Sequence, residues 1–112
     1  MKFYKINDKI VITDTELTEG TELTPNTTDG AHEKHVPVIE QQGDHVTVKV
    51  GSVAHPMLDV HYIEWIVLET ATGYQKHDLK PGMEPKAEFA VTEPVIAAYE
   101  YCNLHGLWAA KA

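Results

Sequence analysis

The sequence has no arginine and only one cysteine, and each scarcity excludes a class of protein. All nine basic residues are lysines, and 17 acidic residues bring the formal net charge to −8. Without arginine there is no planar fork for bidentate contacts to phosphate groups or to guanine. The acidic balance also repels polyanions. Nucleic acid and anionic membrane surfaces are therefore not expected as partners.

A single cysteine cannot form an intrachain disulfide, which excludes the disulfide frameworks of small secreted proteins. Long apolar runs are missing too, since none approaches the ~18 residues of a membrane span. Residues 1–8 are too polar for the core of a signal peptide. We therefore expect a cytoplasmic protein without membrane association. In that reducing compartment the lone thiol stays available for chemistry or for a metal.

The composition of the chain changes near residue 30. Residues 1–30 are rich in threonine and acidic residues, and only Phe3–Ile12 has the apolar content of ordered structure, with Lys9–Ile12 as a short strand. Too little of this segment is apolar to form a core of its own. We interpret residues 1–30 as a short N-terminal arm and residues 31–112 as one folded domain.

From Val36 onward the pattern is one of short strands separated by turn residues. Lys80-Pro81-Gly82-Met83 has proline and glycine at the central positions of a type II turn. Val95–Tyr101 has helical propensity as well, but its neighbours favour a strand. About seven strands at this spacing predict an all-β, antiparallel β-sandwich. The candidates include His45–Val50, His61–Leu68, Tyr74–Leu79, Ala87–Val91, Val95–Tyr101 and a strand around Trp108.

Five potential metal ligands lie in three segments, each flanked by proline or glycine. One thiolate and four imidazoles suit zinc, copper or iron. Taken singly, a histidine in a polar loop is more often an exposed surface residue, and a cysteine and a histidine separated by two residues also occur by chance. The five together favour a metal site. They are His35, His55, His61, Cys102 and His105.

The number and type of these donors discriminate between metals. Structural zinc takes four ligands, usually with more than one cysteine. Blue copper takes two histidines, one cysteine and a weak axial group such as methionine, but no methionine follows His105. Five nitrogen and sulfur donors favour mononuclear iron with one open position. A cupredoxin-like copper electron-transfer domain and a non-catalytic zinc or interaction module remain as alternatives.

The sequence also resembles the superoxide reductases, the neelaredoxin and desulfoferrodoxin family, over residues 29–112. The resemblance implies an immunoglobulin-like sandwich and the one-electron reduction of superoxide to hydrogen peroxide. It implies a mononuclear non-haem iron bound by His35, His55, His61, His105 and Cys102. The matching runs are Glu33–Ile39, Lys49–Met57, His61–Ile66 and Tyr101–Trp108.

The resemblance assigns further roles. It implies that Glu33 takes the sixth position on ferric iron. Because a net charge of −8 repels superoxide, a local positive patch is needed, and Lys34 is the candidate for attracting the anion and for holding a water that delivers a proton. The resemblance also implies a rubredoxin-like electron donor, while leaving open whether the chain forms a homo-oligomer. The backbone N–H groups of Asn103 and Leu104 are expected to face the Cys102 sulfur. Two-iron members carry a four-cysteine domain, which Phe3–Val11 resembles without its cysteines, so the chain is expected to be of the one-iron type.

Overall fold

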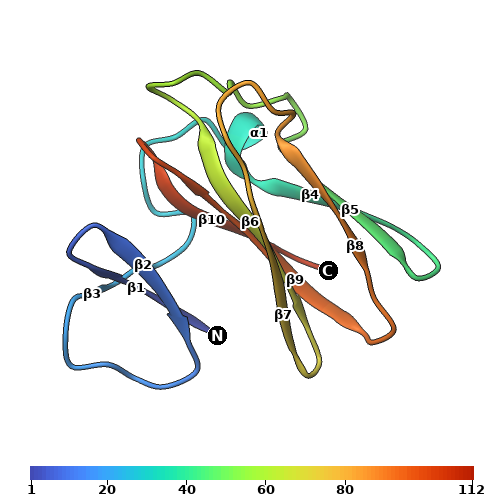
Figure 1. The fold of residues 1–112 in the computed structure, drawn as a ribbon, viewed down its shortest axis with the longest axis horizontal. Helices are drawn as coiled ribbons and strands as arrows, with labels where there is room; N and C mark the ends of the chain where they lie inside the picture. The colour runs from blue at the N-terminus through green and yellow to red at the C-terminus, as the bar shows by residue number, and fades with distance from the viewer.

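The computed structural model describes all 112 residues, which form ten strands and one short helix. Figure 1 shows their arrangement along the chain. The elements are β1 (Lys2–Ile6), β2 (Lys9–Thr13), β3 (Thr21–Glu22), α1 (His32–His35), β4 (Pro37–Gln42), β5 (His45–Val50), β6 (Ile63–Thr70), β7 (Gly73–Asp78), β8 (Lys86–Ala90), β9 (Val95–Cys102) and β10 (Gly106–Lys111).

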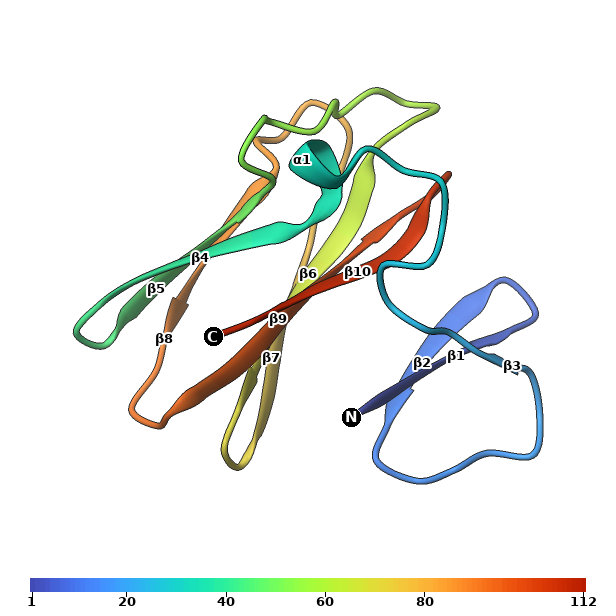
Figure 2. The same cartoon turned by 180° about the vertical axis from the view of Figure 1, so that it is seen from behind.

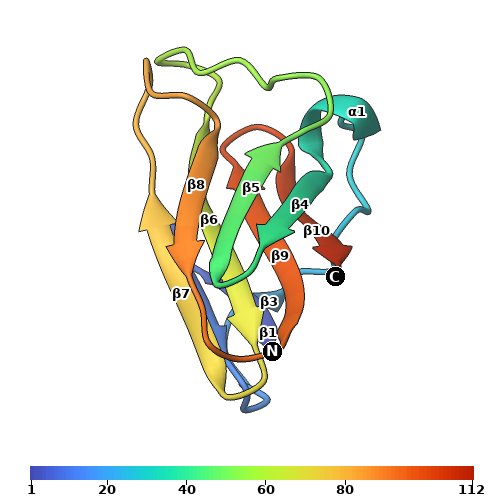
Figure 3. The ribbon, with the colours of Figure 1, turned by 90° about the vertical axis from the view of Figure 1, so that its right-hand side faces the viewer.

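Seven of the strands form a sandwich, as the sequence predicts. A four-stranded sheet has the order β10-β9-β6-β7, and a three-stranded sheet has the order β4-β5-β8. All neighbouring strands pair antiparallel. Figure 3 shows the two sheets face to face, with α1 and the loop between β5 and β6 at one end. The all-β antiparallel fold is confirmed.

The core between these sheets follows from the two-residue period of the strands. In β5, Val46, Val48 and Val50 point inward and are buried, while their neighbours lie nearer to solvent. Each fully buried valine contributes about 1.5–3 kcal/mol of hydrophobic stabilisation. They pack in one cluster with Ile66 from β6 and Cys102 at the end of β9. The thiol therefore sits at the edge of the core and not on the surface.

The N-terminal strands form a separate small sheet with the order β2-β1-β3, which lies outside the four-stranded sheet (Figures 1 and 2). Phe3 attaches it to the sandwich, because its side chain is 2% exposed and its ring centre lies 5.8 Å from that of Trp65 and 4.8 Å from that of Tyr99. The predicted strand at Lys9–Ile12 is confirmed as β2. The pairing of the two-residue β3 with β1 was not predicted, because so short and exposed a segment has no hydrophobic pattern.

Other local predictions have mixed outcomes. Val95–Tyr101 is a strand, and the type II turn is confirmed by a φ of 88° at Gly82 and a hydrogen bond of 3.1 Å from the Met83 N–H to the Lys80 carbonyl. The segment around Glu33 was predicted to be a loop, but it contains α1, whose four residues are too few to show a helical period. No helix of the protein is long and apolar enough to cross a membrane.

Candidate metal centre

All five predicted ligands meet at one end of the sandwich. His35 ends α1, His55 and His61 lie in the loop between β5 and β6, Cys102 ends β9, and His105 lies in the turn before β10. His61 was expected at the start of a strand but precedes β6 by two residues, because it pairs with Leu58 across a tight turn. One donor atom from each of the five residues lies within 4.8 Å of the others.

Hydrogen bonds fix the tautomers of two of the imidazoles. The Nδ1 atom of His35 lies 2.7 Å from the Ala31 carbonyl oxygen, and that of His55 lies 2.6 Å from the Pro56 carbonyl oxygen. A carbonyl oxygen only accepts, so Nδ1 carries the proton in both rings and Nε2 presents a lone pair. These two Nε2 atoms face each other at 3.2 Å. Two facing lone pairs repel each other unless a cation lies between them.

The other three donors complete the same arrangement. The Cys102 Sγ atom lies 3.5 Å from the His55 Nε2 atom and 3.9 Å from the His105 Nδ1 atom. The Nε2 atom of His61 is buried and has no hydrogen-bond partner, an arrangement that costs free energy unless the atom is ligated. The donor set therefore fits a transition metal with nitrogen and sulfur ligands.

Burial favours the neutral form of three of these imidazoles, those of His35, His55 and His61. Removal from water lowers the pKa of His55 to about 4 and also lowers the pKa of His35 and of His61. The proximity of the other histidines adds to this lowering. A neutral imidazole can bind a metal without first losing a proton. The site is therefore prepared for a cation at the pH at which most proteins work.

The Cys102 thiol has the opposite shift. Burial raises its pKa, while the backbone N–H groups of Leu104 and His105 lower it. The expectation for Leu104 is thus confirmed. The expectation for Asn103 is wrong, because its N–H donates to the Tyr62 carbonyl at 3.2 Å. A bound metal ion would ionise this thiol, and the two N–H groups would stabilise the thiolate.

The backbone of α1 is packed directly on the loop that carries His55. The Glu33 carbonyl accepts hydrogen bonds from the Val53 N–H at 2.9 Å and from the Ser52 hydroxyl at 3.2 Å. Gly51 permits this approach, since a Cβ atom there would lie 2.7 Å from the Glu33 oxygen. The side chains of Glu33 and Lys34 remain exposed. Lys34 is close enough to His61 to lower the pKa of that imidazole.

Asn103 connects the loop of His61 to the turn of Cys102, a role that the sequence did not reveal. Its Oδ1 atom accepts from the Tyr62 N–H at 2.9 Å, and its Nδ2 atom donates to the Val60 carbonyl at 3.0 Å. The hydroxyl of Thr28 also donates to the His105 carbonyl. The predicted ligands are therefore held in place by hydrogen bonds between loops that are far apart in sequence.

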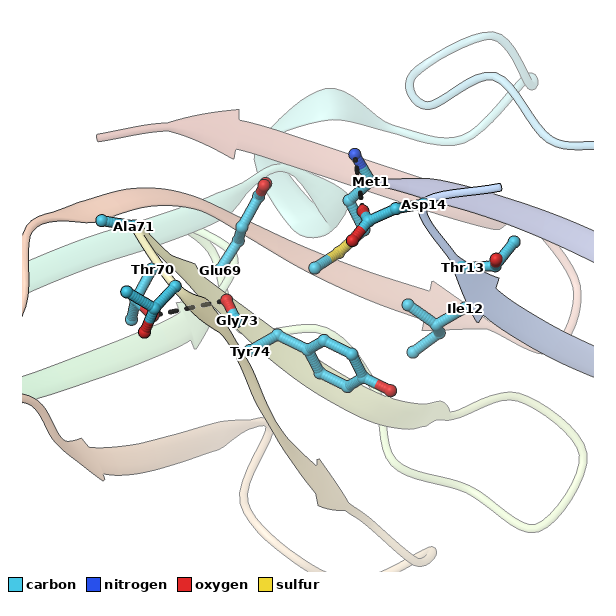
Figure 4. A pocket seen from close by; sticks show the side chains of 10 residues that line it. Met1, Ile12, Thr13, Asp14, Glu69, Thr70, Ala71, Gly73 and Tyr74 are labelled. Carbon is cyan, nitrogen blue, oxygen red and sulfur yellow. Dashed lines mark hydrogen bonds and ion pairs between the residues drawn. The ribbon is translucent and has the colours of Figure 1, made fainter. Parts of the chain in front are cut away.

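A cleft of about 340 Å³ lies at the opposite end of β6, between the N-terminal sheet and the turn from β6 to β7 (Figure 4). The amino group of Met1 lies 3.6 Å from a carboxylate oxygen of Asp14 there. Glu69 is the other acidic residue of its lining. The cleft contains neither histidine nor cysteine, so it does not compete with the five-residue cluster as a site for this chemistry.

Comparisons with known proteins agree with this geometry. The desulfoferrodoxin family matches residues 27–111. A desulfoferrodoxin homolog from Archaeoglobus fulgidus is 58% identical over 82 residues, which cover 73% of this chain and 66% of the relative. A superoxide reductase from Pyrococcus abyssi is 36% identical over 96 residues, which cover 68% of this chain and 83% of the relative.

The fold has solved counterparts as well. The crystal structure of the superoxide reductase from Treponema pallidum superimposes with a TM-score of 0.88 at 38% identity and covers 99% of both chains. The structure of a 1Fe superoxide reductase from Giardia intestinalis gives a TM-score of 0.63 at 33% identity, covering 71% of this chain and 97% of the other. With its single cysteine, this chain belongs to the desulfoferrodoxin family as a member without a four-cysteine site.

Proposed function

We propose that the chain is a superoxide reductase, which converts superoxide, one electron and two protons into hydrogen peroxide. The observation that carries the proposal is the convergence of four imidazoles and one buried thiol within 4.8 Å. The family match and the superoxide reductases among its relatives support the same activity. Iron held at this site would supply the electron by passing from the ferrous to the ferric state.

We propose His35, His55, His61, His105 and Cys102 as the ligands of that iron. Four neutral imidazoles leave the charge of a divalent ion uncompensated, and the thiolate reduces it by one unit. The local charge is then positive in a chain whose net charge is −8. An anion such as superoxide is attracted to this position at short range, although it is repelled by the chain as a whole.

Lys34 is the proposed attracting and proton-delivering group. It is exposed on α1, next to His61, and its ammonium group can hold a water molecule that passes a proton to the product. Attraction of this kind changes association rates by about 10–10³-fold and weakens as salt is added. Glu33 is the proposed sixth ligand of the oxidised centre, where its carboxylate would displace the product.

After each turnover the ferric iron has to regain an electron from another molecule, and we propose that a rubredoxin-like protein supplies it. A reducing compartment such as the cytoplasm would keep the Cys102 thiol available as a ligand. The cupredoxin-like alternative is not supported. Copper would need only three strong ligands, whereas five donors converge here, and the named relatives are desulfoferrodoxins and superoxide reductases.

Metal analysis of the purified protein together with its visible spectrum tests the proposal. We expect one iron per chain and, after oxidation, an absorption band from thiolate-to-iron charge transfer. Cys102→Ser should abolish the band, while substitution of the uninvolved, exposed His45 by alanine should leave it unchanged. Stoichiometric zinc in a colourless protein would contradict the proposed function, as would iron-loaded protein that does not consume superoxide.

A further inference from the structure

A groove of about 590 Å³ runs between the N-terminal sheet and the four-stranded sheet of the sandwich. One wall comes from the hairpin of β1 and β2, and the other from β6, β7 and the end of β9. The elements that form these walls, the small sheet and the strands β6, β7 and β9, are labelled in Figure 2. The groove is a different surface from α1, which carries Lys34.

Positive charge is concentrated in this groove. Four of the nine lysines line it, together with three acidic residues, so it carries one positive charge in excess within a chain of net charge −8. The lysines are all exposed. Only one of them forms an ion pair, between Lys76 and Asp78 at 3.2 Å. The unpaired ones are Lys5, Lys9 and Lys80. Outside the groove, three of the five lysines are paired with carboxylates, namely Lys2, Lys49 and Lys86, and only Lys34 and Lys111 are not.

Three residues that line the groove are sequence neighbours of predicted metal ligands. Tyr101 and Asn103, which flank Cys102 in the sequence, both line the groove, and so does Tyr62, the neighbour of His61. The Trp65 ring stacks on that of Tyr101 with centres 5.8 Å apart. A redox group bound in the groove would therefore contact residues directly bonded to His61 and to Cys102. The packed rings of Trp65 and Tyr101 and the hydrogen bonds of Asn103 lie along this route.

We propose that this groove is the docking surface for the electron donor, an acidic one-electron carrier protein. The inference rests on the proposed function and adds the partner's charge and its place of contact. An acidic protein is repelled by the excess negative charge of the rest of the chain and attracted by the unpaired lysines, which orients it before contact. In the transfer, the reduced carrier loses one electron and the ferric centre gains it. No bond forms or breaks.

The position of the groove allows the electron carrier and superoxide to reach the same metal centre from different sides. The carrier approaches past the residues flanking Cys102, while superoxide is drawn to the exposed side chain of Lys34 on α1. A docked carrier then leaves the substrate's approach open. It also gives the N-terminal sheet a function without any metal of its own, because Lys5 and Lys9 come from that sheet.

The test compares two charge-reversal variants of the full chain that change the net charge equally. One is K5E/K9E, in the groove, and the other is K2E/K111E, which leaves the groove untouched. The affinity of an acidic recombinant rubredoxin for the zinc-loaded protein is measured by calorimetry at low and at physiological ionic strength. We expect K5E/K9E to weaken binding about tenfold at low salt and to reduce its salt dependence, with a much smaller change in K2E/K111E.

Reduction of the ferric protein by reduced rubredoxin gives a second measurement. Its rate is divided by the rate with dithionite, a small reductant that needs no docking surface, and this ratio should fall in K5E/K9E. Neither measurement uses superoxide, so a failure of the proposed activity would not affect them. Equal affinities in the two variants would overturn the proposal. So would weaker binding only in V60S/L104S, because that result would place the carrier on the exposed apolar residues near His61.

Discussion

Asn103→Ala offers a sharp test of how the centre is held together. The substitution removes two hydrogen bonds, from the Tyr62 N–H at 2.9 Å and to the Val60 carbonyl at 3.0 Å. Each such bond contributes about 0.5–1.5 kcal/mol net, and the partly buried Tyr62 N–H also loses its acceptor, so we expect a loss of about 2 kcal/mol. Because these bonds join the loop of His61 to the turn of Cys102, much of that loss should appear in metal binding.

A loss of about 2 kcal/mol corresponds to roughly 30-fold in affinity. Competition between the protein and a ferrous chelator measures it directly. Asn26→Ala is the matched control, because Asn26 makes the same pair of bonds with Ala109, accepting its N–H at 2.8 Å and donating to its carbonyl at 3.1 Å. That variant should lose stability in urea but keep its iron affinity. Parental iron affinity in Asn103→Ala, or an equal loss in the control, would refute the reasoning.

Three further predictions concern charge and protonation. Lys34→Ala should slow the reaction with superoxide about tenfold at low salt and flatten its salt dependence, as followed by pulse radiolysis, and a parental rate would remove Lys34 from the mechanism. Glu33→Ala should strengthen azide binding to the oxidised protein about tenfold, in a spectral titration, since a competing carboxylate worth about 1.4 kcal/mol is gone; unchanged binding would contradict its role as sixth ligand. Burial and the hydrogen bond to Glu69 raise the pKa of Tyr99 to about 12, so between pH 10 and 12 the unfolded chain ionises this group more readily than the folded one, and stability should fall over that range. Tyr99→Phe should remove about 1–2 kcal/mol of that alkaline loss in urea unfolding, and an identical pH dependence would show that this phenol does not contribute.

The sandwich was predictable because side chains in its strands alternate between a buried and an exposed face. His45–Val50 alternates in the sequence, and the structure buries Val46, Val48 and Val50 on one face. The strand β6 has a nearly continuous apolar run because both of its faces are covered, Ile66 toward the other sheet and Trp65 toward Phe3. The helix α1 and the strand β3 were not predictable, because four and two residues carry no periodic signal.

The donor types and their spacing predicted a metal site, and the family resemblance proposed the same five residues as its ligands. The sequence alone does not show the contacts between the loops that carry these residues. Asn103 has no signal of its own between Cys102 and His105, since its bonding depends on where the segment around Tyr62 comes to lie. The same holds for Gly51, whose need for a small residue appears only once α1 rests on it. Contacts between distant loops are decided by the whole fold.

The N-terminal sheet has a structural role that the composition of residues 1–30 does not reveal. The four-stranded sheet is apolar on both faces, and its outer face carries the buried side chains of Trp65, Val67, Tyr101 and Leu107. Without a cover these side chains would face water next to Cys102. Phe3 contributes to that cover, and its phenyl ring holds the N-terminal sheet in place because it stacks on Trp65 and packs at a tilt against Tyr99. A chain that has no cysteines for a second metal in this region therefore still needs the sheet, since it covers the strand β9, which ends in Cys102.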